Sequence, residues 1–263
     1  MMHIDFNHMT CVVTGAASGM GRQLALKYAE AGANLVLLDY NEALLAQTAD
    51  LIAQSGARVL PCKTDVSSSA QLEAAFAQAE AAFGAIHVLA NCAGISTSRL
   101  ILDVPEAEWD RVININLKSV FLASQLAAKN MIAHKVPHGK ILTISSISSK
   151  IGEVGNGVYS VSKAGINCLT QVLAQELGPH GISVSAVCPG YVNTELMMQA
   201  IRTRGPLEGM TPEAYEQSLL RQVPLGRMVE PEEIADFMLF LSSPYADYIT
   251  GVSLTMAGGR MLL

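Results

Sequence analysis

Two side chains that could move a proton lie one helical turn apart in the chain. Tyr159 and Lys163 are separated by four residues in a segment with helical character, so they are expected to share one face of a helix. Ser146 ends a strand-like run thirteen residues before Tyr159. A loop between this strand and the helix could bring the three groups together at the mouth of a sheet. The alternative is a solvated surface pair without a chemical role.

The ammonium of Lys163 would favour ionisation of the Tyr159 phenol. A free tyrosine has a pKa near ~10, and bringing it to neutrality takes a shift of about 3 units, or roughly 4 kcal/mol. A cation about 4–5 Å away contributes roughly 3–4 kcal/mol at an effective dielectric constant of ~20. We therefore expect Tyr159 to act as acid and base near neutral pH, while Ser146 holds or polarises the substrate oxygen.

The sequence offers no competing catalytic cluster. The six histidines do not gather, and none has a sequence partner that would make it a base. The cysteines show neither a CxxC pair nor a ligand spacing to the histidines; they are Cys11, Cys62, Cys92, Cys168 and Cys188. We therefore expect no metal site and no disulfides, in keeping with a reducing compartment.

A glycine-rich turn follows the first strand-like segment. "TGAASGMG" places Gly15, Gly19 and Gly21 within seven residues, with a helix beginning among them. Such a turn lets backbone N–H groups approach a pyrophosphate at a helix N-terminus. Ser18 and Met20 belong to the same turn and are expected to contact the cofactor. The spacing differs from G-x-G-x-x-G, and similar turns also serve tight packing alone.

Two aspartates at strand ends could contact the adenosine half of a dinucleotide. Asp39 follows the glycines by about 20 residues, where a carboxylate accepts hydrogen bonds from a ribose and repels a 2′-phosphate. The glycine loop contains no Arg or Lys, so the expected cofactor is NAD rather than NADP. Asp39 could instead cap the helix over 42–54, which would leave the preference open. Asp65 could accept from the adenine amino group or cap the helix that starts near Ser69.

Strand-like and helix-like segments alternate along the chain. Strands are expected at 10–14, 34–39, 58–65, 86–91, 140–146, 182–188 and 252–256, and helices at 20–31, 42–54, 69–83, 106–133, 158–178 and 231–242. Residues 194–222 are polar, methionine-rich and expected to be irregular. Apolar strands separated by helices indicate a parallel sheet covered on both faces, and right-handed crossovers make it a doubly wound α/β fold in one domain.

Composition excludes several partner classes. The net charge of −6 argues against nucleic-acid and anionic-membrane binding, which need a basic face. No run reaches the ~18 apolar residues of a membrane span, and the start lacks the features of a secretory signal, so the expected location is the cytoplasm. Half of the residues are hydrophobic and only 15% are charged, which makes a homo-oligomer plausible.

Five motifs in order resemble the short-chain dehydrogenase/reductase family over nearly the whole chain. "TGAASGMG" matches T-G-x-x-x-G-x-G, "NCAG" (91–94) resembles N-N-A-G, and "ISS" followed by "YSVSK" matches the family's Ser and Y-x-x-x-K. "PGYVNT" (189–194) resembles P-G-x-x-x-T, and "PLGRMVEPEEIADFMLFLSSPYADYITG" resembles the C-terminal segment. In "NCAG", Cys92 replaces the second Asn, so any cofactor contact there must come from the backbone.

The resemblance implies a Rossmann-type sheet of seven parallel strands and a catalytic tetrad of Asn116, Ser146, Tyr159 and Lys163. In the family, the Tyr is the acid/base, the Ser steadies the substrate, the Lys lowers the Tyr pKa and binds the nicotinamide ribose, and the Asn holds a water. Asn116 is chosen over Asn114 because it matches the family's Asn-Leu. The cofactor contacts indicated by the motifs and the resemblance are Gly15, Ser18, Gly19, Met20, Gly21, Asp39, Asp65, Val66, Asn91, Cys92, Ala93, Gly94, Tyr159, Lys163, Pro189, Gly190, Val192 and Thr194.

The resemblance also divides the chain and suggests its assembly. Residues of about 10–95 would form the dinucleotide-binding half and about 96–263 the catalytic half of a single domain over 1–263. A homotetramer is favoured, with a dimer as the alternative. Residues 194–222 could form a lid over the substrate or an ordinary surface helix pair. Arg202 and Arg204 lie in this segment and are expected to be solvated, although either could contact an anionic substrate.

The expected reaction is hydride transfer between a secondary alcohol or ketone and the nicotinamide of NAD. The first substrate hypothesis is a polyol, a sugar or a vicinal diol/hydroxyketone, because an NAD preference suits oxidation. The alternative is a 3-oxoacyl thioester reductase. A third hypothesis, from a different class, is a non-catalytic NAD-binding regulator, against which the intact tetrad argues.

Overall fold

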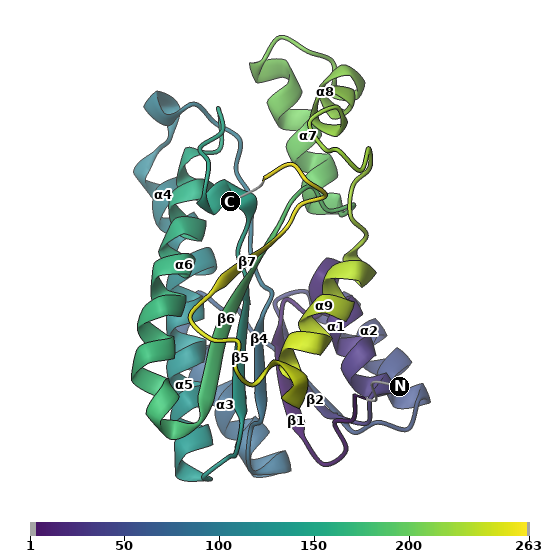
Figure 1. The fold of residues 1–263 in the computed structure, drawn as a ribbon, viewed down its shortest axis with the longest axis vertical. Helices are drawn as coiled ribbons and strands as arrows, with labels where there is room; N and C mark the ends of the chain where they lie inside the picture. The colour runs from purple at the N-terminus through teal and green to yellow at the C-terminus, as the bar shows by residue number, and fades with distance from the viewer. Residues whose placement is uncertain (1–3, 262–263) are drawn as a thin grey trace.

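The computed structural model describes residues 4–261, and its centre is one parallel sheet of seven strands (Figure 1). The strands are β1 (Thr10–Thr14), β2 (Asn34–Asp39), β3 (Val59–Lys63), β4 (Val88–Asn91), β5 (Gly139–Ile144), β6 (Ile182–Pro189) and β7 (Ser253–Met256). Their order across the sheet is β3-β2-β1-β4-β5-β6-β7, and every neighbouring pair is parallel. The predicted doubly wound sheet is confirmed.

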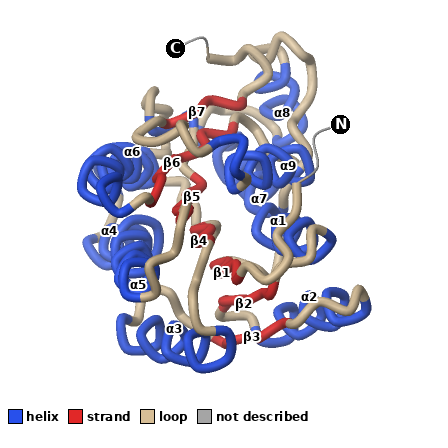
Figure 2. Tube along the Cα trace, turned by 60° about the horizontal axis from the view of Figure 1, so that its bottom comes forward, coloured by secondary structure: helices blue, strands red, loops and turns tan. Residues whose placement is uncertain are grey.

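Helices cover both faces of this sheet, as Figure 2 shows. They are α1 (Gly19–Glu30), α2 (Glu42–Gln54), α3 (Ser69–Phe83), α4 (Glu106–Ile113), α5 (Ser119–Ala133), α6 (Gly157–Leu177), α7 (Glu195–Leu207), α8 (Pro212–Leu220) and α9 (Pro231–Ser242). Helices α1, α2 and α9 lie on one face, and α3, α4, α5 and α6 on the other. Because apolar strand residues meet helices on both sides, two separate buried cores form.

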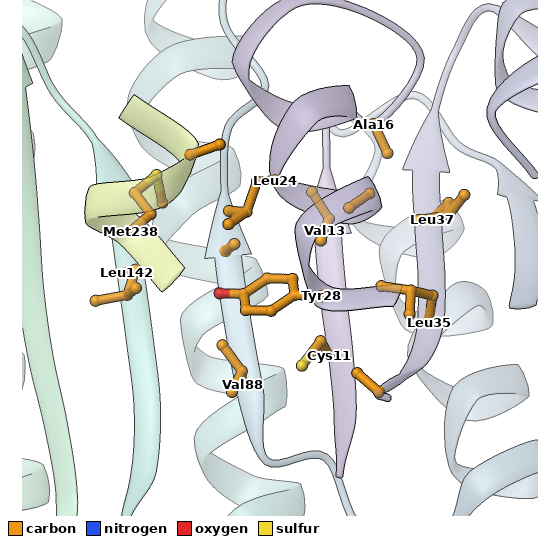
Figure 3. Close-up of a cluster of buried hydrophobic side chains, with 14 of the residues drawn as sticks. Cys11, Val13, Ala16, Leu24, Tyr28, Leu35, Leu37, Val88, Leu142 and Met238 are labelled. Carbon is orange, nitrogen blue, oxygen red and sulfur yellow. The ribbon is translucent and has the colours of Figure 1, made fainter. Parts of the chain in front are cut away.

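The core beneath α1 and α9 brings an early helix and a late helix of the chain into contact. Tyr28 of α1 points across the sheet toward α9, between Leu24 and Cys11 (Figure 3). Its ring is fully buried, and its hydroxyl is hydrogen-bonded to Ser242 Oγ at the end of α9. A buried tyrosine is stable only where its hydroxyl finds such a partner. This contact anchors the C-terminal helix beside the first strand.

The strand order reverses at β1, which pairs with β2 on one side and β4 on the other. The crossovers that leave these strands run to opposite faces, so their carboxyl ends diverge and open a crevice. Ligands of open α/β sheets bind at such a switch point. The glycine turn follows β1 and "NCAG" begins at the last residue of β4, so both motifs border the crevice.

Residues 194–222 fold into α7 and α8, so the expectation that this segment is irregular is wrong. The side chain of Thr194 caps α7 by accepting from Met197 N, and Thr211 caps α8 by accepting from Ala214 N. The buried side chains of this pair include Ile201, Tyr215 and Leu219. Gly205 and Pro206 lie inside α7 and weaken the helical pattern in the sequence.

The predicted helix over 106–133 is interrupted by a π-helical turn at Asn114–Lys118 between α4 and α5. Three predicted strands are also shorter at their ends: pairing starts at Val59 in β3 and at Val88 in β4, and β5 stops at Ile144. Ser145 and Ser146 therefore lie beyond the β5 ladder, where their side chains can turn toward α6. Between residues 4 and 261, no helix is long and apolar enough to cross a bilayer.

Candidate active site

Tyr159 and Lys163 occupy the first turns of α6, close to the ends of β4 and β5. The Lys163 side chain is buried, its Nζ donates a 2.7 Å hydrogen bond to the carbonyl of Ile144, and it lies 5.5 Å from the centre of the Tyr159 ring. A lysine so placed is held by the protein interior. The alternative of a solvated surface pair is therefore wrong.

The segment after β5 is held against α6 by hydroxyl groups. Ser145 Oγ donates to the backbone carbonyl of Lys163 over 3.1 Å, and Ser146 Oγ accepts from Ser148 N over 3.1 Å. The Ser146 hydroxyl is also hydrogen-bonded to Tyr159. The predicted meeting of Ser146, Tyr159 and Lys163 is thus present in the fold.

The electrostatics of this pair differ from the sequence-based expectation. Burial raises the pKa of Tyr159 to about 12, although the hydrogen bond from Ser146 lowers it. Burial also lowers the pKa of Lys163 to about 8. The prediction that Lys163 alone nearly brings the phenol to neutrality is wrong, because removing both groups from water disfavours both charged forms.

Asn116 sits in the π-helical turn between α4 and α5 and is fully buried. Its Oδ1 accepts from Ile95 N over 2.8 Å, and its Nδ2 donates to Ile95 O over 2.9 Å and to Ser162 Oγ over 3.2 Å. Asn116 thereby links the loop after β4 to α6. A Cβ added at Gly94 would lie 3.5 Å from Asn116 Oδ1 and 3.6 Å from Lys163 Nζ, so this glycine lies beside both side chains.

A cleft of about 1580 Å³, open solvent at its mouth included, follows the crevice between β1 and β4. The predicted cofactor residues that line it are Gly15, Ser18, Gly19, Met20, Gly21, Asp39, Asp65, Val66, Cys92, Ala93, Gly94 and Thr194. Ser18 precedes α1 without a side-chain hydrogen bond to it, and no acidic side chain lies in the first turn. The helix N-terminus therefore keeps donors for a pyrophosphate.

Glycine is needed at each of these positions of the turn, for different structural reasons. Gly15 and Gly19 adopt φ of 67° and 54°, in the left-handed region. A Cβ at Gly21 would overlap the carbonyl oxygen of Gly15, so α1 can start this close to the turn only with glycine at that position. The cradle therefore fits a dinucleotide pyrophosphate.

The two aspartates border the cleft and do not cap the helices that follow them. Asp39 accepts from Ala17 N over 3.1 Å and from Asn41 N over 2.9 Å, while Asn41 itself caps α2. Asp65 accepts from the backbone and hydroxyl of Ser67, and α3 is capped by Ser68. The alternative that Asp39 caps α2 is wrong, because Asn41 caps that helix. The alternative that Asp65 caps α3 is wrong, because Ser68 does so.

Two parts of the "NCAG" motif differ from the predicted cofactor contacts. Asn91 is buried outside the lining of the cleft, and its amide reaches Ser124 and Thr143 over 3.4 Å. The backbone N–H groups of Cys92 and Ala93 both donate to Thr14 Oγ1, so the backbone contact predicted at Cys92 could come only from its carbonyl.

A second cavity of about 620 Å³ lies beside Tyr159. Its lining includes Ser146 and Tyr159, together with Pro189, Gly190, Val192 and Thr194 from the predicted set. Met20, Thr194 and Leu196 line both cavities, so the two are neighbours with a shared wall. The cavity therefore adjoins both Tyr159 and the cleft between β1 and β4.

Three residues of this cavity, Glu153, Tyr191 and Arg204, were not among the predicted site residues. The sequence did indicate that residues 147–157 and 194–222 set the substrate, and it raised Arg204 as a possible contact to an anionic substrate. Arg204 follows Ala200 by four residues and Ile201 by three, and this spacing indicates the buried face of a helix. Among residues 4–261, no group of three or more His, Cys, Asp and Glu side chains could hold a metal ion.

Comparison with known proteins gives consistent matches over the whole fold. The family model described as Enoyl-(Acyl carrier protein) reductase matches residues 15–260. The (2S)-[(R)-hydroxy(phenyl)methyl]succinyl-CoA dehydrogenase subunit BbsD of Thauera aromatica is 38% identical over 98% of this chain and 99% of its own. The human (3R)-3-hydroxyacyl-CoA dehydrogenase is 35% identical over 95% of each chain.

A solved structure agrees with these relatives. A putative gluconate dehydrogenase from Agrobacterium tumefaciens has a TM-score of 0.90 and 30% identity, and the match covers 100% of both chains. The chain belongs to the short-chain dehydrogenase/reductase family, as an oxidoreductase that acts on CH–OH groups with a nicotinamide cofactor.

Proposed function

We propose that the protein interconverts 3-hydroxyacyl and 3-oxoacyl thioesters. The observation that carries this proposal is the cavity beside Tyr159, which adjoins the dinucleotide cleft, in a chain that is similar to two proteins named as CoA-thioester dehydrogenases. The family model's description likewise names an acyl thioester carrier. This substrate class was the second choice from the sequence, behind a polyol, a sugar or a diol.

The residues of the tetrad supply proton transfer and positioning. When bound, the nicotinamide supplies or accepts the hydride at the substrate carbon. In reduction, the protonated Tyr159 gives its proton to the carbonyl oxygen and becomes a phenolate, and in oxidation this phenolate takes the hydroxyl proton of the substrate. Ser146 holds the same oxygen, while Lys163 would reach the nicotinamide ribose and Asn116 would hold a water for proton relay.

Apolar side chains around the cavity suit an acyl chain. Ile147, Leu196 and Met197 form part of its wall. A polyol would gain little from such surface, whereas an acyl group would bury it.

NAD is the proposed cofactor form. Asp39 lines the cleft at the end of β2, and both of its oxygens are held by backbone N–H groups of Ala17 and Asn41. A fixed carboxylate at this position suits the two ribose hydroxyls of NAD and repels the 2′-phosphate of NADP.

The deciding experiment is a substrate screen of the purified protein that follows the absorbance of the reduced nicotinamide. We expect turnover with 3-oxoacyl-CoA and NADH that is at least about a hundredfold above that with polyols or simple diols. Gluconate belongs in the panel because the Agrobacterium neighbour is described as a putative gluconate dehydrogenase. Preferential turnover of gluconate or a polyol would overturn the thioester proposal in favour of the second candidate, a sugar-acid or polyol dehydrogenase.

The chain is also proposed to form a homo-oligomer, with a tetramer favoured. Phe121 of α5 and Val161 and Val172 of α6 are apolar side chains that a single copy leaves exposed. Association of copies through these helices would remove this surface from water. Light scattering measures the mass of the assembly, and a monomer at micromolar concentration would contradict the proposal.

A further inference from the structure

One arginine in the wall of the cavity beside Tyr159 is buried, whereas a second arginine on the same helix is exposed. Arg204 lines the cavity from α7, and its side chain is only 6% exposed. Arg202, two residues earlier on the same helix, is 61% exposed and pairs with the exposed Glu195. The expectation that both are solvated holds for Arg202 and is wrong for Arg204. Burial of a guanidinium is costly unless its donors are matched.

The donors of Arg204 are only partly matched within the chain. Its Nη2 donates to Glu153 Oε2 over 2.9 Å, and its guanidinium carbon lies 5.8 Å from the centre of the Tyr215 ring. Its Nε is buried and has no hydrogen-bond partner. An arginine carries five N–H donors, so a carboxylate that uses one of them leaves the guanidinium short of acceptors.

The acceptors beside Arg204 are already in use. Glu153 Oε1 accepts from the Tyr191 hydroxyl over 3.4 Å, and Glu153 Oε2 accepts from Arg204. Glu153 is the one acidic side chain among the residues that line the cavity, so no second carboxylate of the lining is available to the guanidinium. The cavity wall therefore has donors on Arg204 without matching acceptors.

We propose that Arg204 binds a second carboxylate carried on the acyl part of the substrate, so that the preferred substrates are 3-oxo and 3-hydroxy thioesters of dicarboxylic acids. This inference rests on the proposed function. A carboxylate that enters the cavity would supply the missing acceptors, and charge-assisted hydrogen bonds of this kind are among the strongest in proteins. Arg204 is then a specificity residue, separate from the tetrad.

The first test measures binding without turnover. Calorimetry in the presence of NADH compares adipate with its uncharged analogue adipamide, for the unaltered protein, Arg204→Gln and Arg202→Gln. We expect adipate to bind at least about tenfold more tightly than adipamide. Arg204→Gln should abolish this difference, and Arg202→Gln, the matched control on the same helix, should keep it. Equal binding of the two ligands, or a preference that survives Arg204→Gln, overturns the inference.

The second test compares kcat/KM for 3-oxoadipyl-CoA with that for 3-oxohexanoyl-CoA, which lacks only the distal carboxylate. The ratio should exceed about ten, fall toward one in Arg204→Gln, and recover in part in Arg204→Lys, which keeps the charge. Glu153→Gln breaks the same buried pair but leaves the cation free for substrate, so it should raise the ratio. If the pair serves only to hold the fold, both variants shift the ratio in the same direction or leave it unchanged, and the inference is wrong.

The two tests separate this inference from the proposed function. If neither thioester is turned over but adipate binds through Arg204, the thioester function fails while the carboxylate site stands. If both thioesters are turned over equally well, the function stands and the site fails. Thermal melting of each variant shows whether the altered chain is folded at the assay temperature.

Discussion

Lys163 Nζ lies 5.5 Å from the centre of the Tyr159 ring, on the first turns of one helix. Burial raises the pKa of Tyr159 to about 12 and lowers that of Lys163 to about 8. At neutral pH the phenol therefore keeps its proton and can donate it to a carbonyl oxygen, which is what reduction of a ketone requires. The shared face predicted from the spacing is real, but the ordering of the two pKa values comes from burial.

Replacing Tyr159 by Phe should remove the proton donor and leave the shape of the cavity nearly unchanged. We expect kcat/KM to fall by at least about 100-fold, the lower end of what a positioned general acid contributes. Steady-state kinetics measure the loss, and calorimetry should show that NADH still binds. Tyr248→Phe is the matched control because Tyr248 is fully exposed. Undiminished turnover by Tyr159→Phe would disprove the assigned role.

Replacing Lys163 by Met should change the dependence of stability on alkaline pH. The folded pKa of Lys163, about 8, lies below the ordinary lysine value of 10.5, so between these values the unfolded chain binds more protons than the folded one. Stability contributed by this group therefore rises as pH increases from about 8 to about 10.5. The buried charge costs stability below that window, so Lys163→Met should be the more stable protein at neutral pH.

The measurement is the difference in urea midpoint between Lys163→Met and the unaltered protein at several pH values. The difference should be largest near neutral pH and shrink toward pH 10.5. Above pH 10 the raised pKa of Tyr159 acts in the opposite direction in both proteins, because there the folded chain binds more protons. A difference that is constant from pH 7 to 10.5 would show that Lys163 is not desolvated as described.

Replacing Asp39 by Asn should weaken the discrimination against NADP. The amide retains an oxygen that can accept from Ala17 N or Asn41 N, but it no longer repels a 2′-phosphate. We expect the ratio of kcat/KM with NADH to that with NADPH to fall by about tenfold or more. Asp50→Asn, on the exposed side of α2, should leave the ratio unchanged. A preference of the unaltered protein for NADPH would refute the NAD proposal outright.

Replacing Gly21 by Ala should damage both the fold and the cofactor cradle. The added methyl group would overlap Gly15 O, so α1 must shift away from the turn. We expect a loss of about 1–3 kcal/mol in the free energy of unfolding, as for other overpacked sites, and weaker binding of NADH. Chemical denaturation and calorimetry measure the two effects.

Gly178 provides the matched control for this change. It ends α6 with φ of −53°, and an added Cβ would meet nothing within 4 Å. Gly178→Ala should therefore be neutral or stabilising by up to about 1 kcal/mol. Equal effects of the two substitutions would contradict the close approach of α1 to the glycine turn.

Much of the fold could be predicted because local patterns and global structure agree. Strand and helix bounds over 34–39, 42–54 and 69–83 follow from apolar runs and punctuating turns, and the structure repeats them unchanged. The bounds of α7 and α8 could not be predicted in this way. Gly205 and Pro206 oppose helix formation locally, while burial of Ile201, Tyr215 and Leu219 in the tertiary fold supports it.

The meeting of Ser146, Tyr159 and Lys163, the proposed catalytic residues, could be predicted from the sequence because they belong to one strand–loop–helix unit whose spacing brings them together. The sequence could not predict the pKa values, because they depend on burial contributed by distant segments. The spacing of Arg204 from Ala200 and Ile201 separates it from Arg202 only once the segment is known to be a helix, and the sequence predicted this segment to be irregular. The packing of α7 turns Arg202 toward solvent and Arg204 toward Glu153, because the two side chains lie on different faces of the helix.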